Sequence, residues 1–420
     1  MGTIIIGGGI IGTSIAYFLS ESSGDPSSIH IIESSSRLFA SASGYAAGFL
    51  ARDWFAPAAA ELGALSFKLH QELAEEHDGS KKWGYTPSTA LSLALQKGVG
   101  IGTGERGEDW LLDGTSRAEV SARKDLLRED GTPTWLTKQR GSLEVISSED
   151  GCAQVDPLRL CEFMMEACRA RGVQIHFPAE VVSLGKDEQG SVVGVSLVSD
   201  GGNVPDEIRC KNIVISSGAW TPAVFKNMFP KSTISVPISP LAGYSLLIQS
   251  PRHSLQDEIL YGRSHAIFSA PTKAYAWAPE IFSRKGGGIY IAGLNDAKLT
   301  LPERATGPII EDEAMAELKK VAVHLMGRAA SDGDQITEND LEITREALCF
   351  RPVAKRGTPI ITKLSDIELG EGTKSPVSGG VFIAAGHGPW GISLSLGSGK
   401  VVAEMIRGEK TSADISQLSL

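Results

Sequence analysis

The sequence has 420 residues, of which 42% are apolar and 21% are charged, and its formal net charge is −10. This length is too great for one simple hydrophobic core and suggests two domains. The acidic balance argues against nucleic acid or an anionic membrane surface as a partner, and no apolar run is long enough to span a bilayer.

The chain opens with a pattern that predicts a strand, a tight glycine turn, a helix and a second strand. Thr3 to Ile6 is a β-branched run, and Gly7 follows it directly. We expect Gly7 to make the turn, Gly9 to let a pyrophosphate reach the backbone, and Gly12 to let the helix pack close to the strand. This pattern predicts a dinucleotide site rather than a chance glycine turn.

Two further features of the opening segment support this prediction. The N–H groups of Ile10 and Ile11 begin the helix, where the positive end of the helix dipole suits phosphate. Glu33 ends the second strand, Ile29 to Ile32, where a carboxylate can accept both hydroxyls of an adenosine ribose. The acid argues against a 2′-phosphate and hence against NADP, and it leaves NAD and FAD open.

The segment that follows Glu33 is rich in Ser, Ala and Gly. One interpretation is a flexible connector. The other is a second cofactor loop, in which only small side chains fit and hydroxyls bond phosphate, and the preceding glycine motif favours it. The residues that such a loop would use are Ser34, Ser41, Ser43, Ala46, Ala47 and Gly48.

Patterns in the middle of the chain alternate between clear and weak. Ala58 to Glu76 is helical by composition, whereas the pattern weakens from Trp83 to Ser148, where Ser116 to Asp130 is compatible with a helix. Asp156-Pro157 opens a helix that runs to Arg171. The strands predicted next are Val173–Phe177, a meander of Val181–Leu184 with Ser191–Val198, and Ile213–Ser217. This order continues a doubly wound sheet.

The last part of the chain predicts an antiparallel roof and a second strand–turn–helix unit. The predicted elements are strands at Gly243–Gln249, Tyr275–Phe282 and Gly288–Ala292, a helix at Glu311–Gly327, strands at Pro359–Ile361 and Val381–Ala385, and a helix at Ile392–Ile406. Gly397 and Gly399 inside the final helix cost about 1 kcal/mol each against Ala. We therefore expect close packing there, against the first helix or the cofactor.

Cysteine usage points to a reducing compartment. Five cysteines form no CxxC pair and no metal-ligand spacing, so no metal site is predicted. Because the first strand begins almost at once, no signal or transit peptide is expected ahead of it. We expect a cytoplasmic protein.

Together these residues resemble the FAD-dependent oxidoreductases of the D-amino-acid-oxidase-like superfamily, in the branch of glycine oxidase, sarcosine oxidase and related fungal amine oxidoreductases. Four landmarks carry the resemblance, in this order and spacing. They are Gly7–Gly12 with Glu33, Asp156-Pro157 with its helix and the strands through Val181, Ser217–Trp220, and Arg351-Pro352 followed by Ala385–Gly388.

The resemblance implies an α/β fold, with a Rossmann-like FAD-binding domain built on a mixed sheet and an antiparallel-sheet α+β substrate domain. The implied FAD-binding domain is discontinuous, at 1–82, 149–236 and 340–420, and the substrate domain takes 83–148 and 237–339. FAD would lie extended from Glu33 across the glycine turn. The further residues implied to contact it are Val181, Gly218, Trp220, Arg351, Gly386, His387, Gly388, Pro389, Trp390, Gly391 and Ile392.

The resemblance also implies oxidation of an amine or amino acid by hydride transfer to flavin, with Arg351 and His387 as catalytic candidates. Arg351 would grip a substrate carboxylate, or else form a structural salt bridge. Cys349 lies near the position at which some relatives bond flavin covalently, and a plain buried cysteine is the alternative. No counterpart of the oxygen-activating lysine is evident, with Lys273 a candidate by neighbourhood only, so oxidase and dehydrogenase both stay open, with molecular oxygen as a candidate acceptor.

Two other functions compete with this one. In the first, FAD is structural and the protein serves as an assembly or trafficking factor. In the second, the glycine turn holds a pyridine nucleotide in a dehydrogenase. Reduction of bound flavin by amines would distinguish an enzyme from a protein with structural FAD. A visible spectrum of the purified protein would show whether the bound cofactor is a flavin or a pyridine nucleotide.

Overall fold

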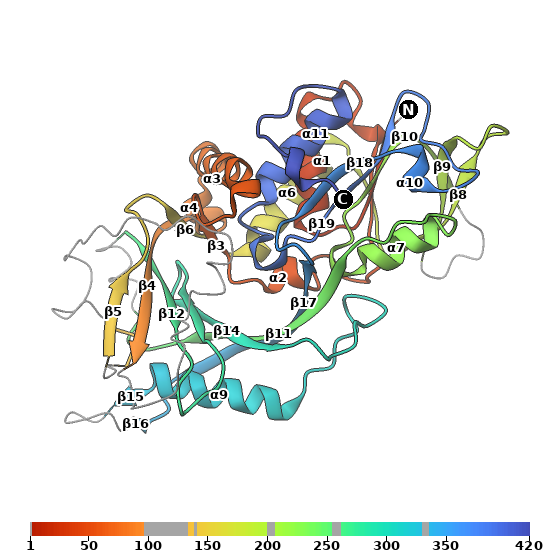
Figure 1. Ribbon diagram of the computed structural model, residues 1–420. Coiled ribbons are helices and arrows are strands. Elements are labelled where there is room, and N and C mark those ends of the chain that lie inside the picture. The colour runs from red at the N-terminus through yellow and green to blue at the C-terminus, as the bar shows by residue number, and fades with distance from the viewer. Residues whose placement is uncertain (1, 96–132, 138–140, 200–205, 254–261, 330–335) are drawn as a thin grey trace.

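Two large sheets organise the computed structural model, which describes residues 2–95, 133–137, 141–199, 206–253, 262–329 and 336–420 (Figure 1). The segment Ser116–Asp130, whose sequence is compatible with a helix, lies outside the described residues. No helix among the described residues is both long enough and apolar enough to cross a membrane.

The first sheet has the strand order β18-β19-β10-β1-β2-β7. Its strands are β18 (Ile360–Leu364), β19 (Gly380–Ala385), β10 (Asp206–Ile215), β1 (Gly2–Ile6), β2 (Ile29–Ile32) and β7 (Gln174–His176). All of them run parallel except the edge strand β18. β8 (Ala179–Lys186) and β9 (Val192–Ser199) form the predicted meander, which pairs with the first half of β10. β1 and β19 both flank β10, so the two ends of the chain meet in one sheet.

Helices cover one face of this sheet and a mixed layer covers the other. The first face carries α1 (Ile10–Ser22), α3 (Pro57–His77), α6 (Pro157–Arg171) and α11 (Ser395–Arg407), and the second carries α7 (Thr221–Met228) and the meander (Figure 1). Alternate residues of β1 point to opposite faces of the sheet. Ile5 packs against the helices on the first face, and Ile4 and Ile6 pack in the hydrophobic core on the second. A strand buried on both faces reads as a continuous apolar run, as β1 does.

Three glycines allow the close approaches that the sequence predicted. A β-carbon on Gly12 would lie 2.1 Å from the carbonyl oxygen of Gly7, so α1 packs directly onto the turn. A β-carbon on Gly399 would lie 2.6 Å from the backbone of Ser14 in α1, and one on Gly397 would lie 2.9 Å from that of Leu62 in α3. The final helix therefore packs against the first helix, as expected.

The second sheet has the order β17-β11-β14-β13-β12-β4-β6-β3, with β5 paired to β4. Its strands are β17 (Glu342–Ala354), β11 (Ile238–Gln249), β14 (Gly288–Asp296), β13 (Glu280–Ser283), β12 (Ser264–Ser269), β4 (Thr86–Leu95), β6 (Cys152–Gln154), β3 (Phe49–Ala51) and β5 (Gly141–Val145). α9 (Asp312–Met326) packs on the outer face, against residues such as Tyr244 and Leu246. The inner face is left to line a cavity.

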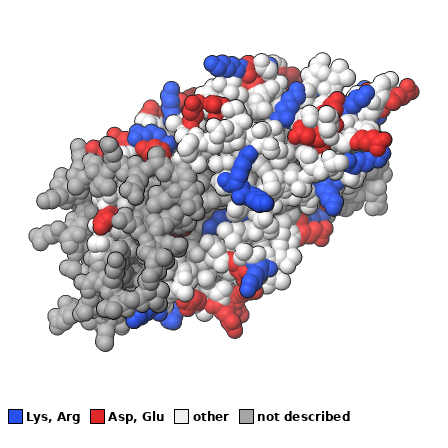
Figure 2. Space-filling model, in the orientation of Figure 1, with Lys and Arg blue, Asp and Glu red and all other residues white. Residues whose placement is uncertain are grey.

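The remaining described elements are short. They are α2 (Ala42–Tyr45), α4 (Gly79–Lys82), α10 (Asp366–Leu369), β15 (Arg328–Ala329), β16 (Ile336–Glu338), and the 3-10 turns η1 (Pro26–Ser28), η2 (Gly218–Trp220), η3 (Gly388–Trp390) and η4 (Ser416–Leu418). Lysine, arginine and acidic side chains alternate over the described part of the face in Figure 2, which agrees with a solvated, mixed-charge surface.

Several elements differ from the sequence-based expectations. The strand predicted at Pro359–Ile361 is present as β18, but β17, which contains Arg351-Pro352 and pairs with β11 along nearly its whole length, was not predicted. Tyr275 lies outside β13, which begins only at Glu280. β4 was not predicted. β17, β3 and β6 belong to the second sheet although the expected boundaries put them in the FAD-binding domain, and those boundaries stay a prediction.

Candidate active site

A cavity of about 580 Å³ extends from the glycine turn after β1 to the inner face of the second sheet. Every residue predicted to contact cofactor or substrate lines this cavity, with the exception of Gly12 and Gly386. Gly12 instead packs beneath the turn, and Gly386 makes a turn of its own at φ +80° after β19. The tertiary structure therefore brings together residues from both ends of the chain and from its middle.

The glycine end of the cavity is held by backbone and by two polar side chains. Gly7 turns at φ +112°. Glu33 accepts a hydrogen bond from Gly8 N at 2.9 Å with one carboxylate oxygen and from Ser35 N at 2.9 Å with the other. Ser43 Oγ accepts one from Ile10 N at 2.9 Å, at the start of α1. Both the acid and the helix N-terminus are thus fixed facing the cavity.

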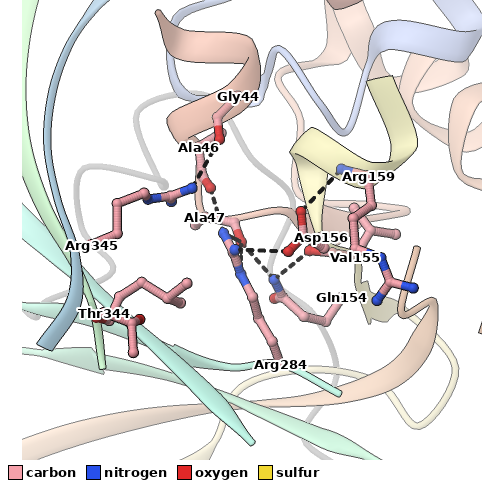
Figure 3. A network of polar contacts seen from close by, with 11 residues as sticks. Gly44, Ala46, Ala47, Gln154, Val155, Asp156, Arg159, Arg284, Thr344 and Arg345 are labelled. Atoms are coloured by element: carbon pink, nitrogen blue, oxygen red, sulfur yellow. Dashed lines mark hydrogen bonds and ion pairs between the residues drawn. The ribbon is translucent and has the colours of Figure 1, made fainter. Parts of the chain in front are cut away.

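The loop between Ser41 and Gly48 is held from below by buried side chains (Figure 3). Arg284 follows β13, and its side chain is only 4% exposed. It donates to the carbonyl oxygens of Ala46 at 2.7 Å and of Ala47 at 2.9 Å, and it pairs with Asp156 at 3.4 Å. Gln154 Nε2 also donates to the carbonyl of Ala47, at 2.7 Å. The loop is therefore clamped in place rather than free, which favours the second of the two interpretations of its sequence.

Burial lowers the pKa of Arg284 to about 10, while the negative charge of Asp156 acts in the opposite direction. The guanidinium stays charged at neutral pH. Sequence reasoning missed this residue because a lone arginine after a strand carries no local signal for burial.

The turn after β19 places His387 at the cavity wall. His387 is 3% exposed, its Nε2 lies 2.9 Å from Ser398 Oγ in α11, and burial lowers its pKa to about 3. The imidazole is therefore neutral near pH 7. Its Nδ1 atom is buried and has no hydrogen-bond partner among the described residues. A catalytic role of His387 stays a prediction.

The inner face of the second sheet forms the other end of the cavity. Residues directly opposite each other in antiparallel strands share a face. By this register Glu280 lies beside Ala292, Ala292 beside Ser245, and Gly243 beside Cys349. Phe282 lies beside Tyr290 on the same face. The side chains of this face that line the cavity are Phe268, Glu280, Phe282, Tyr290, Ala292, Cys349 and Arg351.

Arg351 extends across its neighbouring strand. Its Nη2 atom lies 2.6 Å from the position that a β-carbon on Gly243 would occupy. Within the described ranges, its guanidinium has no ion pair and no side-chain hydrogen bond, which argues against a structural salt bridge. An unpaired guanidinium on a cavity wall is suited to bind an anionic group.

Two cavity residues have pKa values raised by burial. Glu280 lines the cavity, and burial raises its pKa to about 7 even though the charge of Arg351 acts to lower it. Cys349 is 4% exposed, and burial likewise raises the pKa of its thiol. Glu280 was not singled out from the sequence, although an acid in an apolar strand was a usable signal.

Four other polar or charged residues of the second sheet and its loops lie away from the cavity lining. Tyr244 packs on the outer face with its hydroxyl 3.2 Å from Glu311, and the Tyr275 hydroxyl lies 3.1 Å from Ser269 Oγ. His265 is buried in β12, and Lys273 is exposed. Tyr290, for which the sequence predicted no role, is the tyrosine that lines the cavity on the described part of the sheet.

The residues present fit an elongated dinucleotide such as FAD. Gly9 keeps the approach to the start of α1 free of a side chain, because a β-carbon there would crowd Ser43 Oγ, which accepts from Ile10 N, at 3.0 Å. Glu33 lines one part of the cavity, and His387, whose buried Nδ1 atom has no hydrogen-bond partner among the described residues, lines another. A long ligand with a phosphate middle is the shape that connects these groups.

Comparison with known proteins gives a consistent result. The family model for FAD-dependent oxidoreductases matches residues 3–405. A protein of Schizosaccharomyces pombe named as a putative oxidoreductase is 27% identical, over 99% of this chain and 96% of its own. A D-amino acid dehydrogenase of Xanthobacter autotrophicus is 27% identical, over 67% of this chain and 54% of its own.

Solved structures of low identity share the fold. Glycine oxidase from Geobacillus kaustophilus superposes with a TM-score of 0.70 at 21% identity, over 100% of this chain and 97% of the other. L-proline dehydrogenase from P. horikoshii gives 0.70 at 16% identity, over 100% and 96%. In both comparisons the likeness extends over the whole of this chain.

Proposed function

The chain belongs to the family of FAD-dependent oxidoreductases, and from this premise we propose that it oxidises the C–N bond of an amino acid or small amine to an imine. The observation that carries the proposal is the unpaired guanidinium of Arg351, which faces the same cavity as the glycine turn and Glu33. The names of similar proteins, a glycine oxidase and D-amino acid dehydrogenases among them, support a substrate of this class.

Each end of the cavity has a separate task in this proposal. When bound, FAD would supply the electron-accepting chemistry, namely acceptance of a hydride from the carbon that bears the amine. The glycine turn and Glu33 would hold the nucleotide, with the clamped loop of Ser41 to Gly48 beside it. Arg351 binds the substrate carboxylate through two charge-assisted bonds. Phe268 and Phe282 exclude water from the reacting carbon.

Anaerobic titration of the purified holoprotein with glycine, sarcosine and D-amino acids tests the proposal. We expect the visible flavin band to bleach with at least one of them. Arg351→Ala should raise the substrate concentration needed for half-maximal reduction by about tenfold to hundredfold, with flavin content unchanged, and Arg351→Lys should recover part of it.

Failure of every amine to reduce the flavin would contradict the proposal and favour a structural FAD. An unchanged titration in Arg351→Ala would remove Arg351 from the site while leaving the reaction class intact. Reoxidation on admitting air then distinguishes an oxidase from a dehydrogenase.

A further inference from the structure

A second charged group shares the cavity face with Arg351. Glu280 lies on β13 and Arg351 on β17, and the strands between them are β14 and β11. Both side chains point to the inner face by register, and both line the cavity. They are far apart in sequence, so only the strand order brings them to one surface.

The residues between these two groups are small. Ala292 on β14 and Gly243 on β11 have side chains too short to fill the space above the sheet, and the guanidinium already reaches over Gly243. Ala292 pairs with Ser245, which lies two positions from Gly243 along β11. Glu280 is therefore about 10 Å across the strands and about 7 Å along them from the position over which the guanidinium reaches. The Glu280 side chain spans part of this distance. The space that remains suits a compact zwitterion.

Glu280 has no competing partner in the described part of the chain, where it makes no side-chain hydrogen bond and no ion pair. Glu33, Glu180, Glu303 and Arg304 line the cavity from other segments. The charged and titratable groups that line it beside Glu280 from the second sheet and from the turn after β19 are Arg351 and Cys349 from β17, Tyr290 from β14, and His387. Of these only Arg351 carries charge at neutral pH, since burial raises the pKa of Cys349 and of Tyr290 and lowers that of His387. A carboxyl group held in an apolar wall without a partner is costly unless a ligand supplies one.

We propose that Glu280 is a substrate-binding residue that receives the ammonium group of an amino acid whose carboxylate is held by Arg351. The inference rests on the proposed function and narrows it to substrates that carry both charges, rather than simple amines. Glu280 also accepts the proton that the ammonium group must lose. One N–H bond breaks, its electron pair stays on nitrogen, and an O–H bond forms on the carboxylate, which leaves the neutral amine required for hydride loss.

A matched pair of ligands tests the proposal without turnover. 2-Aminoisobutyrate has no hydrogen on its α-carbon and cannot be oxidised by hydride loss, and isobutyrate is the same carboxylate without the amine. Binding of each to the holoprotein is followed by perturbation of the flavin spectrum and by the shift in melting temperature. We expect Glu280→Gln to weaken 2-aminoisobutyrate by about tenfold to hundredfold and to leave isobutyrate unchanged.

Controls separate this inference from the proposed function. Arg351→Ala should weaken the binding of both ligands. Glu342 is an exposed acid at the start of β17, and Glu342→Gln should leave the binding of both ligands unchanged. Glu280→Asp, which keeps the charge, should recover part of the loss, and flavin content per chain checks that each variant is folded. Equal binding of 2-aminoisobutyrate by wild type and Glu280→Gln would overturn the inference, as would equal loss of both ligands. The proposed function fails separately, if amino acids do not reduce the wild-type flavin.

Discussion

The Nη2 atom of Arg351 lies 2.6 Å from where a β-carbon of Gly243 would stand. The guanidinium therefore occupies space that exists only because β11 carries a glycine at this position. Since the crowding atom is the end of a flexible side chain, a larger residue at 243 would displace the guanidinium rather than disrupt the sheet.

Gly243→Ala is accordingly expected to weaken isobutyrate binding by about tenfold, in the range of one charge-assisted hydrogen bond, while flavin content stays normal. Ligand-induced change in the flavin spectrum measures this. Gly24→Ala is the matched control, because a β-carbon there meets nothing within 4 Å. Unaltered binding in Gly243→Ala would show that the position of the guanidinium does not limit carboxylate affinity.

The affinity for an amino acid should depend on pH through Glu280. Burial raises the pKa of this carboxyl to about 7, so it is protonated and uncharged below that pH and ionised above it. Binding of 2-aminoisobutyrate should therefore weaken as the pH falls through about 7, whereas isobutyrate, which needs only Arg351, should not weaken over the same range. Titrations between pH 5.5 and 8.5, roughly centred on that pKa, measure both affinities.

In Glu280→Gln, the affinity for 2-aminoisobutyrate should no longer fall at low pH, so the two ligands should show the same pH dependence of binding. In Arg351→Ala, loss of the nearby positive charge should move the pKa of Glu280 further upward, because that charge acts to lower it. If the affinity of wild type for 2-aminoisobutyrate does not change over this pH range, binding does not depend on the ionisation of Glu280.

Arg284 is expected to be required for both stability and cofactor retention. Arg284→Leu removes the donor to the carbonyls of Ala46 and Ala47 and leaves Asp156 unpaired. Breaking such a buried pair costs about 3 kcal/mol, and the released loop should bind FAD less tightly. Denaturant unfolding and the FAD dissociation constant check this. Arg52→Leu, which removes an exposed pair with Asp53, should cost less than about 1 kcal/mol.

Cys349 should not hold flavin covalently. The thiolate is the reactive form of cysteine, and burial raises the pKa of this thiol and so keeps it protonated. Acid precipitation of the holoprotein should therefore give a colourless pellet and a yellow supernatant. A pellet that stays yellow in wild type and turns colourless in Cys349→Ser would establish the linkage instead.

The sequence by itself determined the nucleotide half of this protein. Gly7, Gly9, Gly12 and Glu33 lie within one continuous strand–turn–helix–strand unit, whose geometry follows from local backbone freedom and helical spacing. The final unit, which ends in α11, is local in the same way. Its internal glycines predicted the contact with α1 that the structure contains.

Only the tertiary structure decided the substrate half. Which face of a strand points inward depends on pairing register, and a shift of one residue would reverse it. That register is set by contacts between segments distant in sequence, as between β17 and β11 or β13 and β14. The sequence could therefore single out Arg351 through a family resemblance, but it could not bring Glu280 and Tyr290 to the same wall, nor show that Gly243 leaves the guanidinium its space.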